Sequence, residues 1–83
     1  MKCKLVTPDK LIFDGEVSSV NIPALNGAMG ILPGHAPIVT TLGKGVLQIQ
    51  STTTTTEYNV EGGFAEVRAN VISILANTAE KIV

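Results

Sequence analysis

Short stretches in which apolar and polar residues alternate, each ended by turn residues, dominate the chain. The clearest covers residues 45–50, where Leu47 and Ile49 alternate with Gln48 and Gln50. A two-residue period of this kind predicts a strand with one buried and one wet face. The threonine run 52–56 is expected to form the tip and return strand of a hairpin, because β-branched residues favour strands. This return strand is expected to continue through residues 58–60, and further strands are expected over residues 4–7, 11–13, 17–22, 64–68 and 71–75.

Turn residues separate these stretches roughly every 8 residues, with no helical period between them. Proline and glycine favour turns between the strands, because proline fixes its own φ and glycine accepts positive φ. The spacing predicts an all-β fold, a sandwich or barrel, in a single domain of 83 residues. The turns are expected at Pro8-Asp9, Asp14-Gly15, Gly62-Gly63 and Ala69-Asn70.

The last residues depart from the strand pattern. Asn77 is followed three positions later by Glu80, which is typical of a capping box at a helix start. We therefore expect a β-sandwich domain over residues 1–77. A C-terminal helical segment, truncated or abbreviated, is expected to start at Thr78-Ala79 and to occupy residues 78–83.

Composition narrows the function classes. Six Lys and Arg against seven Asp and Glu give a net charge of −1, so no basic field is available to hold nucleic acid. No apolar run exceeds four residues, too short for membrane insertion or a signal peptide. The hydrophobic share is nevertheless 45% with only 16% charged residues. A domain this small leaves apolar surface over, which indicates a partner protein.

Candidate chemistry is sparse. His35 is the only histidine, and a metal site needs several donors. Cys3 is the only cysteine, so no internal disulfide can form. Lys2 and Lys4 on either side could lower its pKa, but a nucleophile also needs a base. Three glycines, Gly27, Gly30 and Gly34, lack the lysine and Ser/Thr of a phosphate loop. We predict no catalytic residue, no cofactor and no metal.

One stretch carries a resemblance to a known family. Residues 26–37, NGAMGILPGHAP, resemble the signature of the epsilon subunit of F-type ATP synthase, called delta in mitochondria. Residues 6–9 and 13–17 resemble the opening hairpin of that family, and residues 42–46 resemble the strand that enters its second half. The closing motif is similar to GGFAEV at 62–67 followed by Asn70-Val71 and Leu75-Ala76. Several separated motifs in the family's order make the resemblance specific, and it covers nearly the whole chain.

The resemblance implies a flattened β-sandwich of about ten short strands in two sheets. It also implies a non-catalytic rotor subunit of the central stalk, bound to the gamma subunit and resting on the c-ring, which couples ion flow to ATP synthesis. Such a subunit would be peripheral, on the cytoplasmic face of a bacterial inner membrane or its organellar equivalent. By family position, the gamma-facing residues would be Thr7, His35, Thr40 and Leu42, and the c-ring contact loop would contain Asn26, Gly27, Ala28, Met29 and Gly30.

The sequence departs from the family pattern in two places. Ala28 stands where many members carry an acidic residue, so packing and backbone groups would have to make the c-ring contact. The two-helix C-terminal hairpin of many bacterial members is not expected. Two other functions stay open at this point: a module that binds peptides along a sheet edge, and a small hydrolase that uses Cys3 and His35.

Overall fold

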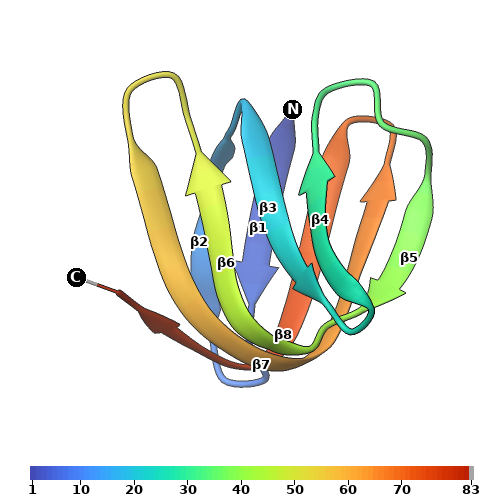
Figure 1. Cartoon of the computed structure of the whole chain (residues 1–83). Helices are drawn as coiled ribbons and strands as arrows, with labels where there is room; N and C mark the ends of the chain where they lie inside the picture. The colour runs from blue at the N-terminus through green and yellow to red at the C-terminus, as the bar shows by residue number, and fades with distance from the viewer. Residues whose placement is uncertain (83) are drawn as a thin grey trace.

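The chain folds into eight β-strands, described by a computed structural model over residues 1–82 (Figure 1). No helix occurs among these residues, so none could cross a membrane. The strands are β1 (Lys2–Val6), β2 (Leu11–Glu16), β3 (Ser19–Ala24), β4 (Gly27–Ile31), β5 (Ile38–Thr41), β6 (Lys44–Gln50), β7 (Thr55–Arg68) and β8 (Val71–Lys81).

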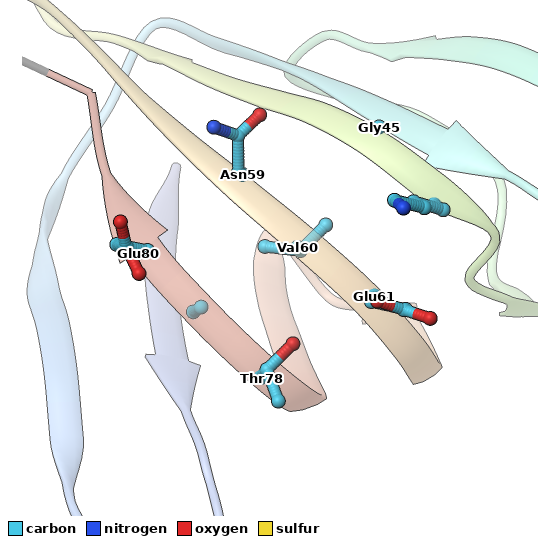
Figure 2. A pocket seen from close by; sticks show the side chains of 8 residues that line it. Gly45, Asn59, Val60, Glu61, Thr78 and Glu80 are labelled. Carbon is cyan, nitrogen blue, oxygen red and sulfur yellow. The ribbon is translucent and has the colours of Figure 1, made fainter.

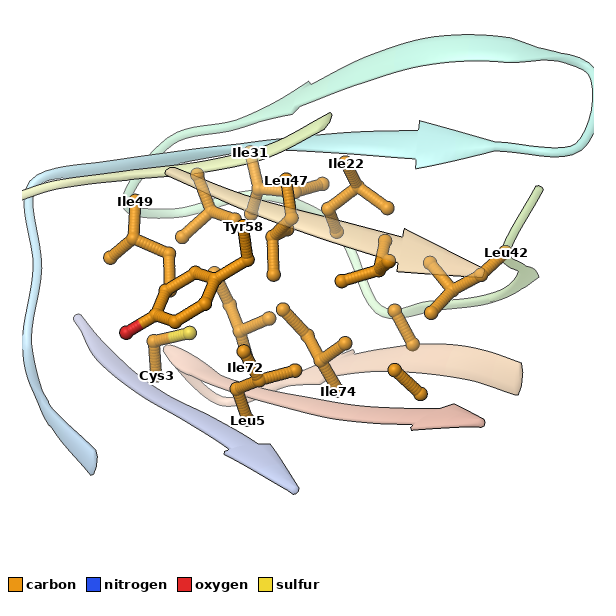
Figure 3. Packing of buried hydrophobic residues seen from close by; sticks show 14 of the residues in the cluster. Cys3, Leu5, Ile22, Ile31, Leu42, Leu47, Ile49, Tyr58, Ile72 and Ile74 are labelled. Carbon is orange, nitrogen blue, oxygen red and sulfur yellow. The ribbon is translucent and has the colours of Figure 1, made fainter. Parts of the chain in front are cut away.

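A continuous hydrogen-bonded sheet runs in the order β2-β1-β8-β7-β6-β3-β4, and β5 pairs with β7. All pairs are antiparallel except β1 with β8. The long strand β7 pairs with β6 through its first half and with β5 through its second half. The sheet folds over on itself at this point, so that β3, β4 and β6 face β1, β5 and the first half of β8 across a core (Figures 1 and 3). The sandwich prediction is confirmed, with the two layers joined through β7 and β8.

The fold-over occurs at Gly62 and Gly63, within β7. Both glycines have positive φ, 69° and 105°, a region that side chains disfavour. Before them the buried residues of β7 are even-numbered, as at Tyr58; after them they are odd-numbered, as at Ala65. The pairing with β8 keeps its register across this change, since Gly63 lies opposite Ala76. The turn expected at Gly62-Gly63 is therefore wrong, because both residues lie within β7. The structure has eight strands where about ten were expected.

The C-terminal helix start is also wrong for the described residues. Residues 78–81 continue β8 and pair with residues 58–61 of β7, and the Ile82 amide donates to the Glu57 carbonyl at 2.9 Å. The backbone amides that a capping box would satisfy are thus used by the sheet. The expected boundary at residue 77 falls inside a strand, and Val83 lies outside the described residues.

The core is built from alternating residues of both layers, as predicted for Leu47, Ile49, Ile72 and Ile74, which are at most 2% exposed. Burial of these side chains is the main stabilising contribution, at roughly 1.5–3 kcal/mol each. Figure 3 shows the two sets of side chains meeting between the ribbons. The buried cluster consists of Cys3, Leu5, Val17, Val20, Ile22, Ile31, Leu42, Leu47, Ile49, Tyr58, Val60, Ala65, Val67, Ile72, Ile74 and Ala76.

Candidate functional site

The outer face of the layer that contains β3, β4 and β6 is polar. The Asn21 amide donates to the Gln48 side-chain oxygen at 2.9 Å, and Gln48 donates in turn to the Glu57 carboxylate at 3.1 Å. Ser19 likewise donates to the Gln50 side chain at 2.8 Å. These bonds join neighbouring strands and satisfy the polar side chains within the chain itself. These five side chains of the face therefore bond to one another across the strands β3, β6 and β7.

The outer face of the other layer carries an apolar row across five strands. Four successive cross-strand pairs form it: Thr41 with Phe64, Phe64 with Leu75, Leu75 with Val6, and Val6 with Leu11. Phe64, Leu75 and Leu11 are 46%, 39% and 52% exposed. A contiguous row of large apolar side chains left in water is typical of a surface that another protein covers. We call these five residues the apolar row.

The residue pattern along the chain does not by itself reveal the apolar row. Its signal is nevertheless present, because Phe64 and Leu75 are large apolar residues at the solvent-facing positions of β7 and β8. The row becomes visible only once the register of five strands is known.

Charged residues lie beside the apolar row on the same face. Two residues along β1 from Val6, Lys4 pairs with Ser73 on one side and with Asp14 on the other. Arg68 forms an ion pair with Glu66 at 3.2 Å, both on β7. An apolar centre with charges at its edge is the usual anatomy of a protein–protein interface.

The four residues expected to face gamma do not form one cluster. Thr7 lies in the β1–β2 turn, where its backbone exchanges hydrogen bonds with Lys10. Thr40 is half-buried opposite Ala65, while the neighbouring Thr41 belongs to the apolar row. Leu42 is only 2% exposed and lies in the core, so its side chain can support an interface but contributes little surface to one.

His35 lies in the β4–β5 connection. Figure 1 shows this connection at the opposite end of the strands from the β1–β2 turn, which contains Thr7. The His35 amide donates to the Leu32 carbonyl at 3.1 Å, and Gly34 has a φ of 85°. With Pro33 as the second residue, these features define a type II turn. The turn is held to the β7–β8 hairpin by a bond from the Gly34 amide to the Asn70 side chain at 3.0 Å.

The residues expected to contact the c-ring form a hairpin end and an edge strand where a loop was expected. Asn26 lies in the β3–β4 turn, and residues 27–30 belong to β4. Ala28 is exposed, whereas Met29 packs against the core. A β-carbon on Gly30 would lie 3.2 Å from the Asn21 side-chain oxygen. Gly30 is exposed, and the Asn21 side chain is the one neighbour that an added β-carbon would meet within 4 Å.

An open hollow of about 670 Å³ lies on the polar face, where β6, β7 and β8 run side by side (Figure 2). Its charged lining residues are Lys44, Glu61 and Glu80, with Asn59 and Thr78 between them. Among residues 1–82, no group of three or more His, Cys, Asp or Glu side chains is placed to hold a metal ion. The hollow shows neither a nucleophile with a base nor a ligand set.

Cys3 is fully buried in the core. Burial raises the pKa of its thiol to about 12, and the Asp14 carboxylate adds to the increase. The lysines that could have lowered this pKa point to the outer face, at exposed positions 2 and 4. A thiol that stays protonated is a poor nucleophile, so the hydrolase alternative finds no support in this site.

Comparison with known proteins shows the family to which this fold belongs. A family model described as "ATP synthase, Delta/Epsilon chain, beta-sandwich domain" matches residues 1–82. The ATP synthase epsilon chain of Leptospira interrogans is 44% identical over 77 residues, which are 93% of this chain and 61% of the relative. The epsilon chain of Pelotomaculum thermopropionicum is 41% identical over 80 residues, 96% of this chain and 60% of that one. The chain thus spans about three-fifths of the length of these relatives.

Solved structures show the same fold. A chain of the OSCP/F1/c-ring assembly of Euglena gracilis mitochondrial ATP synthase superposes with a TM-score of 0.88 at 30% identity, covering 95% of this chain and 51% of that one. A chain of the Tetrahymena thermophila mitochondrial ATP synthase superposes with a TM-score of 0.78 at 22% identity, covering 94% and 63%. The family match, the relatives and the shared fold together show that this chain belongs to the delta/epsilon family of ATP synthase subunits, through its β-sandwich domain.

Proposed function

We propose that this chain is a non-catalytic subunit of the central stalk of an F-type ATP synthase. In this role it binds the gamma subunit, rests on the c-ring and couples ion flow to ATP synthesis. It would work as a peripheral protein on the cytoplasmic face of a bacterial inner membrane, or on the equivalent organellar face. Family membership supports this role, as does the likeness to a chain of an assembly that contains F1 and a c-ring.

The apolar row is the observation that carries the gamma contact. Burying the three partly exposed large side chains of this row would remove apolar surface from water, which contributes favourably to association at about 25 cal/mol per Å². The polar face offers no comparable apolar surface, because there Val46 is the one exposed large apolar side chain among the residues described. We therefore assign gamma to the face with the apolar row, extended by Thr7 at one end and His35 at the other. Thr40 and Leu42 support this face from below.

The β3–β4 hairpin end is the proposed c-ring contact. Leu25 at its tip is 67% exposed, and the exposed backbone of Gly27 to Gly30 can approach another chain closely. The Leu25 amide also donates to the Thr41 carbonyl at 2.9 Å. Because Thr41 belongs to the apolar row, the two proposed contacts adjoin at this hydrogen bond. A load received at the hairpin therefore has a short path to the gamma-facing surface.

Association with the isolated gamma subunit tests the proposal. The chain and the gamma subunit of its own synthase should elute together in size-exclusion chromatography as a one-to-one complex, without nucleotide or another small ligand. Adding the chain to synthase depleted of this subunit should restore proton-coupled ATP synthesis in vesicles. Separate elution together with no gain in coupled synthesis would contradict the proposed role.

A further inference from the structure

Asn70 joins three parts of the chain that are far apart in sequence. It occupies the tip of the β7–β8 hairpin with a φ of 62°, and Ala69 before it has a φ of 49°. Two successive positive φ values define a type I′ turn, which asparagine accepts more readily than most residues. From this position its backbone carbonyl accepts a hydrogen bond from the Lys2 amide at 2.9 Å. Its side-chain oxygen accepts the Gly34 amide at 3.0 Å.

The bond to Gly34 has no substitute in the structure. Residues 32–37 lie between β4 and β5 and belong to neither strand. Within residues 1–82, the Asn70–Gly34 bond is the only hydrogen bond that ties 32–37 to another part of the chain. Pro33 and the Leu32–His35 hydrogen bond shape the turn locally. Apart from its connections to β4 and β5, the 32–37 turn is therefore hydrogen-bonded to the sheet through Asn70 alone among residues 1–82.

The 32–37 segment also contains a contact that orients the ring of His35. The Nδ1 atom lies 2.6 Å from the Ala36 carbonyl oxygen. Because a carbonyl oxygen can only accept, Nδ1 must carry the proton, and Nε2 of the neutral ring is left as an acceptor. The 32–37 segment thus carries a defined hydrogen-bond acceptor, Nε2 of His35, on a half-buried side chain.

We propose that Asn70 is a positioning residue for the stalk partner: its side chain holds the 32–37 turn so that Nε2 of His35 meets a hydrogen-bond donor of the gamma subunit. This inference rests on the proposed function, in which His35 lies at the edge of the gamma-facing surface. Holding a loop in its bound conformation before association raises affinity, because less ordering remains to be done on binding.

Two substitutions at the same position test the proposal. Asn70→Gly keeps the positive φ and the backbone carbonyl but removes the side-chain acceptor, whereas Asn70→Asp keeps an acceptor oxygen. In the whole 83-residue chain, amide hydrogen exchange at Gly34 should accelerate about tenfold in Asn70→Gly and stay near wild type in Asn70→Asp. The affinity for gamma should fall roughly three- to tenfold in Asn70→Gly alone.

A double-mutant cycle with His35→Ala separates positioning from general stability. If Asn70 acts through His35, Asn70→Gly should have little further effect on affinity once His35 is alanine. Additive losses would overturn the proposed route through His35. Unchanged exchange at Gly34 would overturn the clamp itself. Accelerated exchange with unchanged affinity would show that the Asn70–Gly34 bond plays no part in binding gamma. The central-stalk function would stand in that case, because association of the wild-type chain with gamma tests it independently.

Discussion

Gly63 lies opposite Ala76 in the β7–β8 ladder, and the backbone between them leaves no room for a side chain. A β-carbon at Gly63 would overlap the Leu75 carbonyl oxygen and the Ala76 α-carbon. The φ of 105° at Gly63 independently excludes most other residues. This close approach lets two strands move from one layer to the other with their register intact.

Replacing Gly63 by alanine should therefore prevent the fold-over. We expect Gly63→Ala to lower the free energy of unfolding by about 3 kcal/mol or more, since it combines a backbone clash with a strained φ. Urea denaturation followed by circular dichroism measures this. Gly15→Ala is the matched control: its β-carbon would meet only the Phe13 ring at 3.5 Å, an ordinary contact distance. Similar losses in both variants would contradict the special role of Gly63.

A charge placed in the apolar row should weaken binding to gamma. We expect Phe64→Asp to lower the affinity at least about tenfold, because a carboxylate would have to be desolvated in the contact. Val46→Asp provides the control, since Val46 is equally exposed, at 45% against 46%, on the polar face. Isothermal titration calorimetry with folded variants gives both affinities. Equal affinities for the two variants would remove the apolar row from the interface.

Obstructing the β3–β4 hairpin should affect the membrane sector only. Gly30→Val is expected to reduce ATP-driven proton pumping in vesicles containing the complete synthase, while binding to gamma survives. The added side chain also presses on Asn21, since a β-carbon there lies 3.2 Å from its oxygen. Asn21→Ala removes the side chain that donates to Gln48 without obstructing the β4 backbone, and this variant should pump normally. Full pumping by Gly30→Val would argue against the c-ring assignment.

The buried Cys3 thiol should make stability depend on alkaline pH. Folding raises the pKa of this thiol from the ordinary value of 9.0 to about 12. The contribution of the protonated thiol to the free energy of unfolding is therefore complete below pH 9 and is lost as pH rises towards 12. Across this window the free energy of unfolding should fall by up to about 1.4 kcal/mol per pH unit, because only the unfolded chain releases the proton. Cys3→Ala should show a shallower decline in urea titrations between pH 8 and 11. Identical slopes would mean that the thiol ionises equally in both states.

Local pattern predicted much of the fold. The alternation of Leu47 and Ile49 with glutamines identified β6 and its buried face, and the same reasoning placed Ile72 and Ile74 in the core. The turn at Ala69-Asn70 was also found from residue type. In each case the signal lies within a few neighbouring residues.

The misplaced elements are those that depend on partners distant in sequence. The turn expected at Asp14-Gly15 is wrong, because both residues lie within β2 and pair with β1. Gly62-Gly63 has the composition of a turn, and only the pairing with β8 shows that the strand continues through it. Asn77 and Glu80 match a helix cap, but β7 supplies competing hydrogen bonds to the same backbone. The apolar row could not be predicted for the same reason, because it depends on the register of five strands.

The passage of β7 and β8 through both layers has a mechanical consequence. If one outer surface is pushed sideways while the other is held, the force runs along two continuous β-strands as well as across side-chain contacts. The ten residue pairs between β7 and β8 share that force in shear, so no single hydrogen bond has to carry it. The two surfaces should therefore move as one stiff body, and a push on either should reach the other with little lost to deformation in between.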